Sequence, residues 1–373
     1  MSGGRVIPQP HAIEAIACDT VSFMSMFLSM LDHPHVALLS LGLLPLSSMY
    51  VVESHRALKE LDPVVAGRLD EALATRLRPS RHRAKLLDDS RRSIEEVAGD
   101  MFEVAQRQTR LFMKPHVGVL GPLRRAIQPD LGLSTYNGHV FSTTHATAFS
   151  FGQDQDLGEE SYPMGEALGE YVATLLCVLA LQQPQPVRPE ALGGAIEMTD
   201  IKSVALYRRG PLGGLPTQMA VGATLLLANL NYVQYVICRL LPADDHTRFK
   251  LKFIVAYHTD SNLRGIQNRL ASTSAMTAEA ASIFTEALGN ADSRWLRKRT
   301  ILRNVLVHYL VDERHAADVP PCADRMSVIE HFSGVLHYSD VDDLLDRHIA
   351  RLSRTLEDGF DLGDQPFRYC LVT

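Results

Sequence analysis

The sequence has few of the features that mark a disulfide-bonded or zinc-stabilised protein. Its 373 residues include only five cysteines, and no two of them form a C-x-x-C pair. Dispersed cysteines of this kind are typical of reduced thiols in a cytosolic protein. The first residues, MSGGRVIPQPHAIEA, also lack the apolar core and the small-residue cleavage site of a secretory signal peptide. We therefore expect a cytoplasmic protein whose fold does not depend on disulfides or zinc.

Lysine is scarce and the overall charge is acidic. The 37 basic residues are 7 lysines and 30 arginines, and the formal net charge is −6. This balance argues against a protein that coats nucleic acid nonspecifically, because such binding needs a broad basic surface that displaces phosphate counterions. A local basic site is still compatible with this charge. Arginine suits such a site, since its planar guanidinium binds phosphate and carboxylate groups through paired hydrogen bonds.

Several well-known motifs and a clear membrane segment are also missing. The chain has no G-x-x-x-x-G-K-[ST] loop, no G-x-G-x-x-G turn opening a helix, and no G-x-S-x-G, H-E-x-x-H or kinase-type motif. P-loop, serine hydrolase, zinc protease and kinase chemistry therefore have no support. The most membrane-like stretch, Val36 to Val52, is shorter than the ~20 residues of a transmembrane helix and contains Pro45. We predict that it is buried core and that no membrane is involved.

The spacing of apolar residues predicts a mainly helical protein, beginning with a mixed region of unknown role in residues 1–200. Its first helices are expected to break at Asp32 to His35, at Pro45 and at Asp62-Pro63, because proline restricts the backbone. Further along, Asn137-Gly138 between β-favouring residues predicts a hairpin, the small β element of this half. A helix is expected to follow over residues 164–182.

A helical bundle is predicted for residues 210–373. The segment DIKSVALYRRGPLGGLP precedes it and is interpreted as a short strand that ends in a glycine-rich turn. After Pro216 the apolar residues recur with a helical period. This period predicts helices over Thr217–Leu241, Asp245–Leu270, Thr277–Leu288, Ala291–Ala317 and Ser339–Leu356. Ser339 is expected to cap the last helix, and the acids after it complement the positive end of the helix dipole.

The predicted helix Ala291–Ala317 has an apolar side and a polar side. Successive residues advance by about 100°, so one buried stripe is expected to contain Trp295, Leu302, Leu306 and Tyr309. Within about 40° of His308 on the opposite side lie Arg297, Asn304, Asp312 and His315. Arg303 lies about 140° from His308, at the edge of the apolar stripe, where its stem can pack while its head group reaches outward.

Within this helix, the segment LRNVLVHY, Leu302 to Tyr309, resembles the R-x(4–6)-H signature of the HEPN superfamily of helical domains, many of which are ribonucleases. Arg303, Asn304 and His308 match the signature. The resemblance covers one helix by its motif and residues of about 216–360 by their helical pattern. It implies a HEPN-like bundle that acts on RNA or a nucleotide and, where the chemistry is retained, a metal-independent endoribonuclease.

RNA cleavage gives each matched residue a role. Histidine exchanges a proton near neutral pH, so His308 can deprotonate the 2′-hydroxyl or protonate the leaving oxygen. Arg303 can stabilise the charge on the phosphate, while Asn304 orients it. This chemistry requires no cofactor. Superfamily members commonly pair two such helices, which implies a homodimer in which Arg303 and His308 face a shared groove.

Other polar residues are predicted to contact the substrate. The segment AYHTDSNLRGIQNRL places several polar side chains on shared faces of a helix, and more basic residues precede the motif. The expected substrate-binding residues are His258, Asn262, Arg264, Arg297 and Arg299.

Three alternatives remain open at this point. His308, Asp312 and His315 stand at i, i+4 and i+7, a spacing that could direct two imidazoles and a carboxylate toward one metal ion. The chain could instead be an enzyme or binding protein for a small molecule of specialised metabolism. Its pocket would lie between the two halves, with His139 and His145 as candidate lining residues. A third interpretation is a noncatalytic helical interaction protein.

Overall fold

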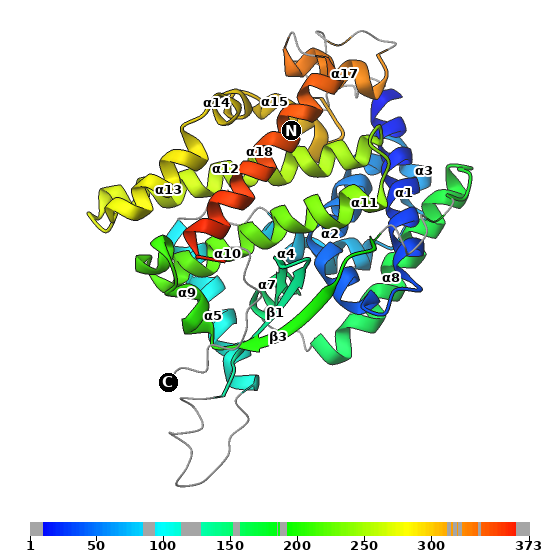
Figure 1. Cartoon of the computed structure of the whole chain (residues 1–373). Helices are drawn as coiled ribbons and strands as arrows, with labels where there is room; N and C mark the ends of the chain where they lie inside the picture. Colours follow the sequence, from blue (N-terminus) through cyan, green and yellow to red (C-terminus); the bar gives the residue numbers. More distant parts are fainter. Residues whose placement is uncertain are drawn as a thin grey trace.

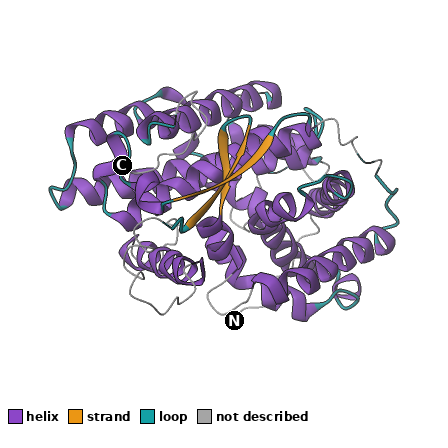
Figure 2. Ribbon diagram, turned by 60° about the horizontal axis from the view of Figure 1, so that its bottom comes forward, coloured by secondary structure: helices purple, strands orange, loops and turns teal. Residues whose placement is uncertain are grey.

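The computed structural model describes residues 10–84, 94–112, 128–151, 157–184, 186, 192–311, 315, 319, 323–334 and 337–362. These residues form a mainly helical protein with one small antiparallel sheet (Figures 1 and 2), as predicted. Figure 2 shows the three strands surrounded by helices. The HEPN-like arrangement of the C-terminal helices stays a prediction.

The N-terminal helices follow the predicted breaks with one exception. Two breaks are confirmed, between α1 and α2 and between α2 and α3, but α2 continues through Pro45. A proline inside a helix costs roughly 3 kcal/mol, yet most of α2 from Leu39 to Leu58 is buried, and this packing outweighs the cost. The predicted break at Pro45 is therefore wrong. The first five helices are α1 (Pro10–Met30), α2 (Val36–Leu61), α3 (Pro63–Ala66), α4 (Glu71–Ala84) and α5 (Ile94–Phe112).

The sheet is built on the predicted hairpin. Strands β1 (Leu131–Tyr136) and β2 (His139–Thr143) pair across Asn137 and Gly138, whose φ angles of 50° and 86° suit a tight turn. The third strand, β3 (Ile196–Ile201), pairs antiparallel with β1 and gives the order β2-β1-β3. Two helices, α7 (Thr144–Phe151) and α8 (Leu157–Val178), follow β2 in the chain.

The segment predicted as a strand before the bundle is mostly not one. Strand β3 covers only Asp200 and Ile201 of that segment. The next residues form the short helix α9 (Ser203–Tyr207) and the 3₁₀ turn η2 (Pro211–Gly214). Leu206 and Tyr207 of α9 are buried, so this segment buries its apolar side chains by packing a helix and not by pairing a strand.

Most of the predicted C-terminal helices are confirmed. The run from Thr217 to Leu240 is continuous, although its middle is a π-helical turn. Asp245 and Thr277 cap α12 and α13 through their side chains. The final helix begins at Tyr338 after His337, so Ser339 lies inside it and is not its cap. The elements are α10 (Thr217–Asn231), η3 (Tyr232–Ile237), α11 (Cys238–Leu240), α12 (His246–Ser272), α13 (Ala278–Leu288), α17 (Arg325–Ser333) and α18 (Tyr338–Gly359).

The predicted long helix Ala291–Ala317 is wrong. The chain forms two short helices instead, α14 (Ala291–Arg297) and α15 (Thr300–His308), with a break at Lys298 and Arg299. Helix α15 ends because Tyr309 adopts a left-handed backbone conformation, with φ 63°. Leu302, Leu306 and Tyr309 are buried as predicted, while Trp295, on the other helix, is half-buried.

One hydrophobic cluster runs through both predicted regions. Its buried members include Phe23 and Tyr136 from the first 200 residues and Leu226, Phe253 and Leu352 from the later ones. Helix α1 packs on α12, α2 packs on α15, and α10 packs on strand β2. The predicted boundary near residue 200 therefore does not separate two hydrophobic cores.

In the part of the chain that the structure describes, three helical runs are long and apolar enough to cross a membrane, judged by length and composition: α1, α2 and Thr217–Leu240. At least half of each apolar window, 50%, 61% and 78% in turn, is buried inside the protein. Leu39 and Leu43, in the stretch predicted as core, have no exposed surface.

A carboxylate buried without solvent contact joins three of these elements. Asp19 of α1 lies 2.6 Å from Nζ of Lys250 and accepts hydrogen bonds from the hydroxyls of Thr247 (2.7 Å) and Tyr309 (2.5 Å). The Lys250 ammonium also lies 3.7 Å from the centre of the Tyr309 ring. Burial alone would raise the pKa of Asp19, but Lys250 and His246 outweigh it and lower that pKa. The ion pair therefore holds α1 and α12 to the residue that ends α15.

A second long-range contact attaches the hairpin to the last helix. His139 of β2 places Nδ1 2.8 Å from Glu357 of α18, and its ring stacks on Tyr235. The side-chain amide of Asn231 donates to the same Glu357 carboxylate at 3.0 Å and to the carbonyl oxygen of Val140 at 2.9 Å. The sheet, α10 and α18 thus share one polar junction.

Replacing Asp19 tests the buried ion pair. Asp19→Asn leaves the Lys250 ammonium buried without its counter-charge, so we expect the free energy of unfolding to fall by about 3–5 kcal/mol in urea denaturation. Combining it with Lys250→Met removes the unpaired charge and is expected to restore part of the loss. Asp32→Asn changes an exposed acid just after α1 and serves as the control. If the Asp19→Asn protein is as stable as the control, the ion pair of Asp19 with Lys250 does not stabilise the fold.

Candidate functional site

The site forms where the end of α15 meets α2 and α4. His308, the last residue of α15, places its ring nitrogen Nδ1 2.7 Å from Oε2 of Glu53 on α2. The other carboxylate oxygen of Glu53 pairs with the guanidinium of Arg81 on α4. Glu53 and Arg81 are buried, with 2% and 8% of their side chains exposed, whereas His308 keeps 29% exposed. A buried carboxylate, paired with a buried guanidinium, thus binds a histidine that reaches the surface.

The charge on Glu53 is stabilised by its two partners. Burial by itself would raise the pKa of this carboxyl, but the hydrogen bond and charge of His308 and the charge of Arg81 outweigh burial and lower the pKa to about 2. Glu53 is therefore ionised at neutral pH and can accept a hydrogen bond from the Nδ1–H of His308. When His308 is neutral and carries its proton on Nδ1, Nε2 on the other side of the ring has a lone pair. An acid that fixes a histidine in this way orients it for proton transfer.

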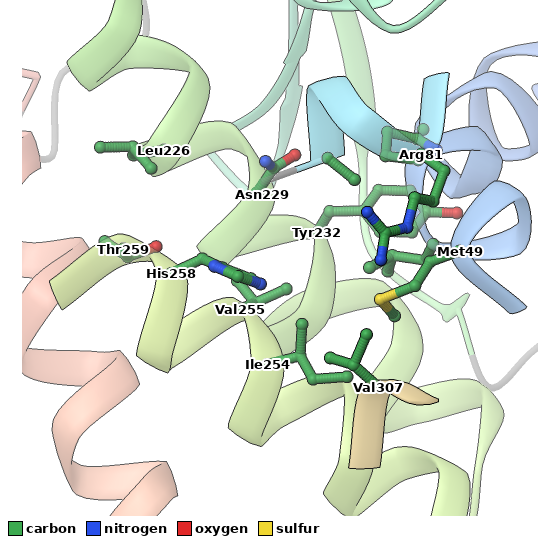
Figure 3. Close-up of a pocket in the computed structure, with 14 residues that line it drawn as sticks. Met49, Arg81, Leu226, Asn229, Tyr232, Ile254, Val255, His258, Thr259 and Val307 are labelled. Atoms are coloured by element: carbon green, nitrogen blue, oxygen red, sulfur yellow. The ribbon is translucent and has the colours of Figure 1, made fainter. Parts of the chain in front are cut away.

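Arg81 links the histidine to a small pocket between α2, α4, α10, α12 and α15 (Figure 3). Apolar side chains including Met49, Ile254 and Val307 line most of it. The guanidinium of Arg81 and the imidazole of His258 point toward one another across the space. The cavity has a volume of about 30 Å³, enough for one or two water molecules. A larger substrate would have to bind outside it, at the exposed edge of His308.

The two other residues of the motif lie on different sides of α15. Asn304 is exposed, and Arg303 is half-buried with its guanidinium 5.4 Å from the centre of the Tyr257 ring. On an α-helix, Arg303 and His308 point about 140° apart. One copy of α15 therefore does not direct both side chains at the same point.

The predicted substrate-binding residues are divided between the interior and the surface. His258 lines the pocket, and Asn262 is buried with its amide donating to the His258 carbonyl oxygen. Arg264 donates to Asp260 at 3.3 Å and to Ser293 at 2.9 Å. Arg264 therefore connects α12 to α14, whereas the Asn262 hydrogen bond lies within α12. Neither residue is among those that line the pocket.

The two predicted substrate-binding arginines near the motif lie close to the surface. Arg297 is exposed at the end of α14, and the guanidinium of Arg299 lies 5.0 Å from the centre of the Trp295 ring. Lys298 between them is also exposed. Arg303 follows on the next helix, so four basic residues lie within seven positions of the chain here.

The geometry on which the metal alternative rested is absent. The spacing of His308, Asp312 and His315 required one helix through all three, but α15 ends at His308, and Asp312 lies outside the described residues. Among the residues that the structure describes, no group of three or more His, Cys, Asp or Glu side chains could hold a metal ion.

Sequence reasoning missed the two residues that support His308. Arg81 lies in the basic segment RPSRHRAK, whose charge is typical of a solvated surface, yet its side chain is buried. Glu53 is the first acid after the apolar run that begins at Val36. A lone acid at the end of such a run was the available signal, because a charge on a buried helix requires a partner.

No protein-family model, curated protein or solved structure matches the chain. The likeness to the HEPN superfamily therefore rests on the motif residues and on the helical pattern around them.

Removing the Glu53 carboxylate is expected to change how stability depends on pH. Glu53→Gln leaves Arg81 buried without an acid and should lower the free energy of unfolding by about 3 kcal/mol at pH 7. A carboxylate with a lowered pKa stabilises the fold above its unfolded pKa and loses this effect as the pH falls. The difference in the free energy of unfolding between wild type and variant should therefore become smaller as the pH falls from 4.5 toward 2.

Urea denaturation at several pH values measures this difference. Glu71→Gln, which removes an exposed ion pair with Lys59, is the matched control. It should have little effect because solvent screens exposed charges. If the difference in the free energy of unfolding stays constant from pH 7 to pH 2, Glu53 is not the ionised partner of His308 and Arg81.

Proposed function

We propose that this protein is a HEPN-like endoribonuclease that cleaves RNA without a metal ion, with His308 as the proton-transfer residue. The observation that carries the proposal is the contact of His308 Nδ1 with the buried Glu53 at 2.7 Å, while the ring stays partly exposed. A surface histidine held by a buried, ionised acid is arranged as a general base. The motif that matches at Arg303, Asn304 and His308 supplies the substrate class.

Each residue has a role in the proposed reaction. Nε2 of His308 takes the proton of the 2′-hydroxyl, and the 2′-oxygen attacks the phosphorus. The bond from phosphorus to the 5′-oxygen breaks, which leaves a 2′,3′-cyclic phosphate, and the leaving 5′-oxygen takes a proton from water to become a 5′-hydroxyl. Arg303 stabilises the extra negative charge on the phosphate, and Asn304 orients it. Glu53 stabilises the positive charge that His308 gains.

We further propose that the active form is a homodimer. Arg303 and His308 diverge on one helix, so a groove lined by both requires a second α15. The basic residues Arg297, Lys298, Arg299 and Arg303 would supply positive charge for the phosphates of a single RNA strand. We place this enzyme in the cytoplasm, without a membrane partner, since its three long apolar runs contribute to one shared core.

His308→Ala is expected to lower the rate of RNA cleavage by 10²–10⁴-fold, the usual contribution of a general base. The measurement is cleavage of a fluorescent single-stranded RNA in the presence of a chelator, with detection of cyclic phosphate ends. His337→Ala is the matched control, because this histidine is 84% exposed and lies outside the site. Wild-type protein that leaves RNA intact, or a His308→Ala variant of full activity, would exclude this function.

Mixing two inactive variants tests the shared groove. If Arg303 of one protomer acts with His308 of the other, Arg303→Ala mixed with His308→Ala should recover about a quarter of the wild-type activity. Half of the randomly mixed dimers are then hybrids, each with one intact site of two. Light scattering gives the oligomeric state of the same samples. A monomer, or a mixture with no recovery, would show that the groove is not shared.

A further inference from the structure

A cavity away from His308 lies between helices α5, α7, α9 and α10, next to Asp130, the residue that precedes β1. Its volume is about 360 Å³, in the range of pockets that hold small organic molecules. Aromatic, aliphatic and polar side chains from both predicted regions line it. They are Phe102, Ala105, Gln106, Asp130, His145, Ser203, Tyr207, Thr217 and Val221.

A neutral hydrogen-bonded pair forms one wall of the cavity. Nδ1 of His145 lies 2.6 Å from the Tyr207 hydroxyl, and both side chains are buried. Burial lowers the pKa of His145 to about 4, against the opposing effect of the Asp130 charge, and burial raises the pKa of Tyr207. Neither group carries a charge at neutral pH. The two groups therefore share a neutral hydrogen bond, whose donor is set by the tautomer of His145.

Asp130 is the one formally charged residue among the described lining residues. Its oxygens accept hydrogen bonds from the Ser203 backbone N–H at 2.6 Å and from the Ser203 hydroxyl at 3.2 Å. These donors fix the carboxylate but do not neutralise it. The neutral His145 does not neutralise it either, although the Asp130 charge acts on both His145 and Tyr207. A ligand with a positive charge would complement this wall.

The other lining residues suit a ligand in which the positively charged group is attached to an apolar part. Phe102, Ala105 and Val221 supply hydrocarbon surface, and the ring faces of Phe102 and Tyr207 attract cations. We propose that this cavity binds a small organic amine, with its ammonium group at Asp130 and its apolar part against Phe102 and Val221. None of these residues belongs to the His308 site, so this inference stands independently of the proposed RNA cleavage.

Three probes of the same size and different charge test the proposal on the full-length protein. They are 2-phenylethylamine, which is cationic, 2-phenylethanol, which is neutral, and phenylacetate, which is anionic. Isothermal titration calorimetry should show saturable binding of the amine, about tenfold weaker binding of the alcohol, and weaker binding still of the acid. Equal binding of amine and alcohol, or no binding of the amine, would overturn the proposal.

Asp130→Asn locates the amine. The asparagine oxygen can still accept from the Ser203 N–H, and its NH2 group can donate to the Ser203 hydroxyl, but the side chain carries no charge. Affinity for 2-phenylethylamine should therefore fall about tenfold, while affinity for 2-phenylethanol is unchanged. Asp200→Asn is the matched control, because this acid is exposed on β3 and is not among the lining residues. If both variants bind the amine like wild type, the proposal fails. If Asp130→Asn does not fold, the ranking of the three probes on the unmodified chain decides.

Discussion

The carboxylate of Asp19 sets the position of much that surrounds the candidate site. It is buried completely, so it is stable as a charge only with Lys250, Thr247 and Tyr309 arranged around it. Tyr309 can reach Asp19 because its backbone turns into the left-handed region at the end of α15. That turn makes His308 the last residue of the helix. The location of the proposed base thus depends on an ion pair made by a different set of residues.

Buried charge recurs in the protein and connects elements that are distant in sequence. Glu53 and Arg81 join α2 to α4 beside His308. The ammonium of Lys252, which has no exposed surface, lies 2.7 Å from Asp342 and 2.6 Å from Asp346 of α18. Removing one member of such a pair leaves an uncompensated charge, which costs more than the pair contributes. These pairs therefore specify how the helices are registered against one another.

Local features of the fold could be predicted from the sequence, and features set by distant partners could not. Asn137-Gly138 defined the hairpin, and the capping residues Asp245 and Thr277 located two helix starts, because each acts on its own neighbours. Pro45 was misread as a helix break because the packing around α2 is invisible to a local rule. The end of α15 was missed for the same reason, since it follows from a contact 290 residues away. His308 could be selected by motif, but its partners Glu53 and Arg81 could not.

The junction of His139, Asn231 and Glu357 also bears on how the protein is made. His139 and Glu357 are 218 residues apart in the chain, and a ribosome synthesises the hairpin long before the last helix. Until α18 emerges, His139 and Asn231 lack their shared carboxylate, and the core that α18 covers stays open to water. Late closure of this kind favours slow folding and transient exposure of apolar surface. The nascent chain is therefore expected to depend on chaperones until its final helix has docked.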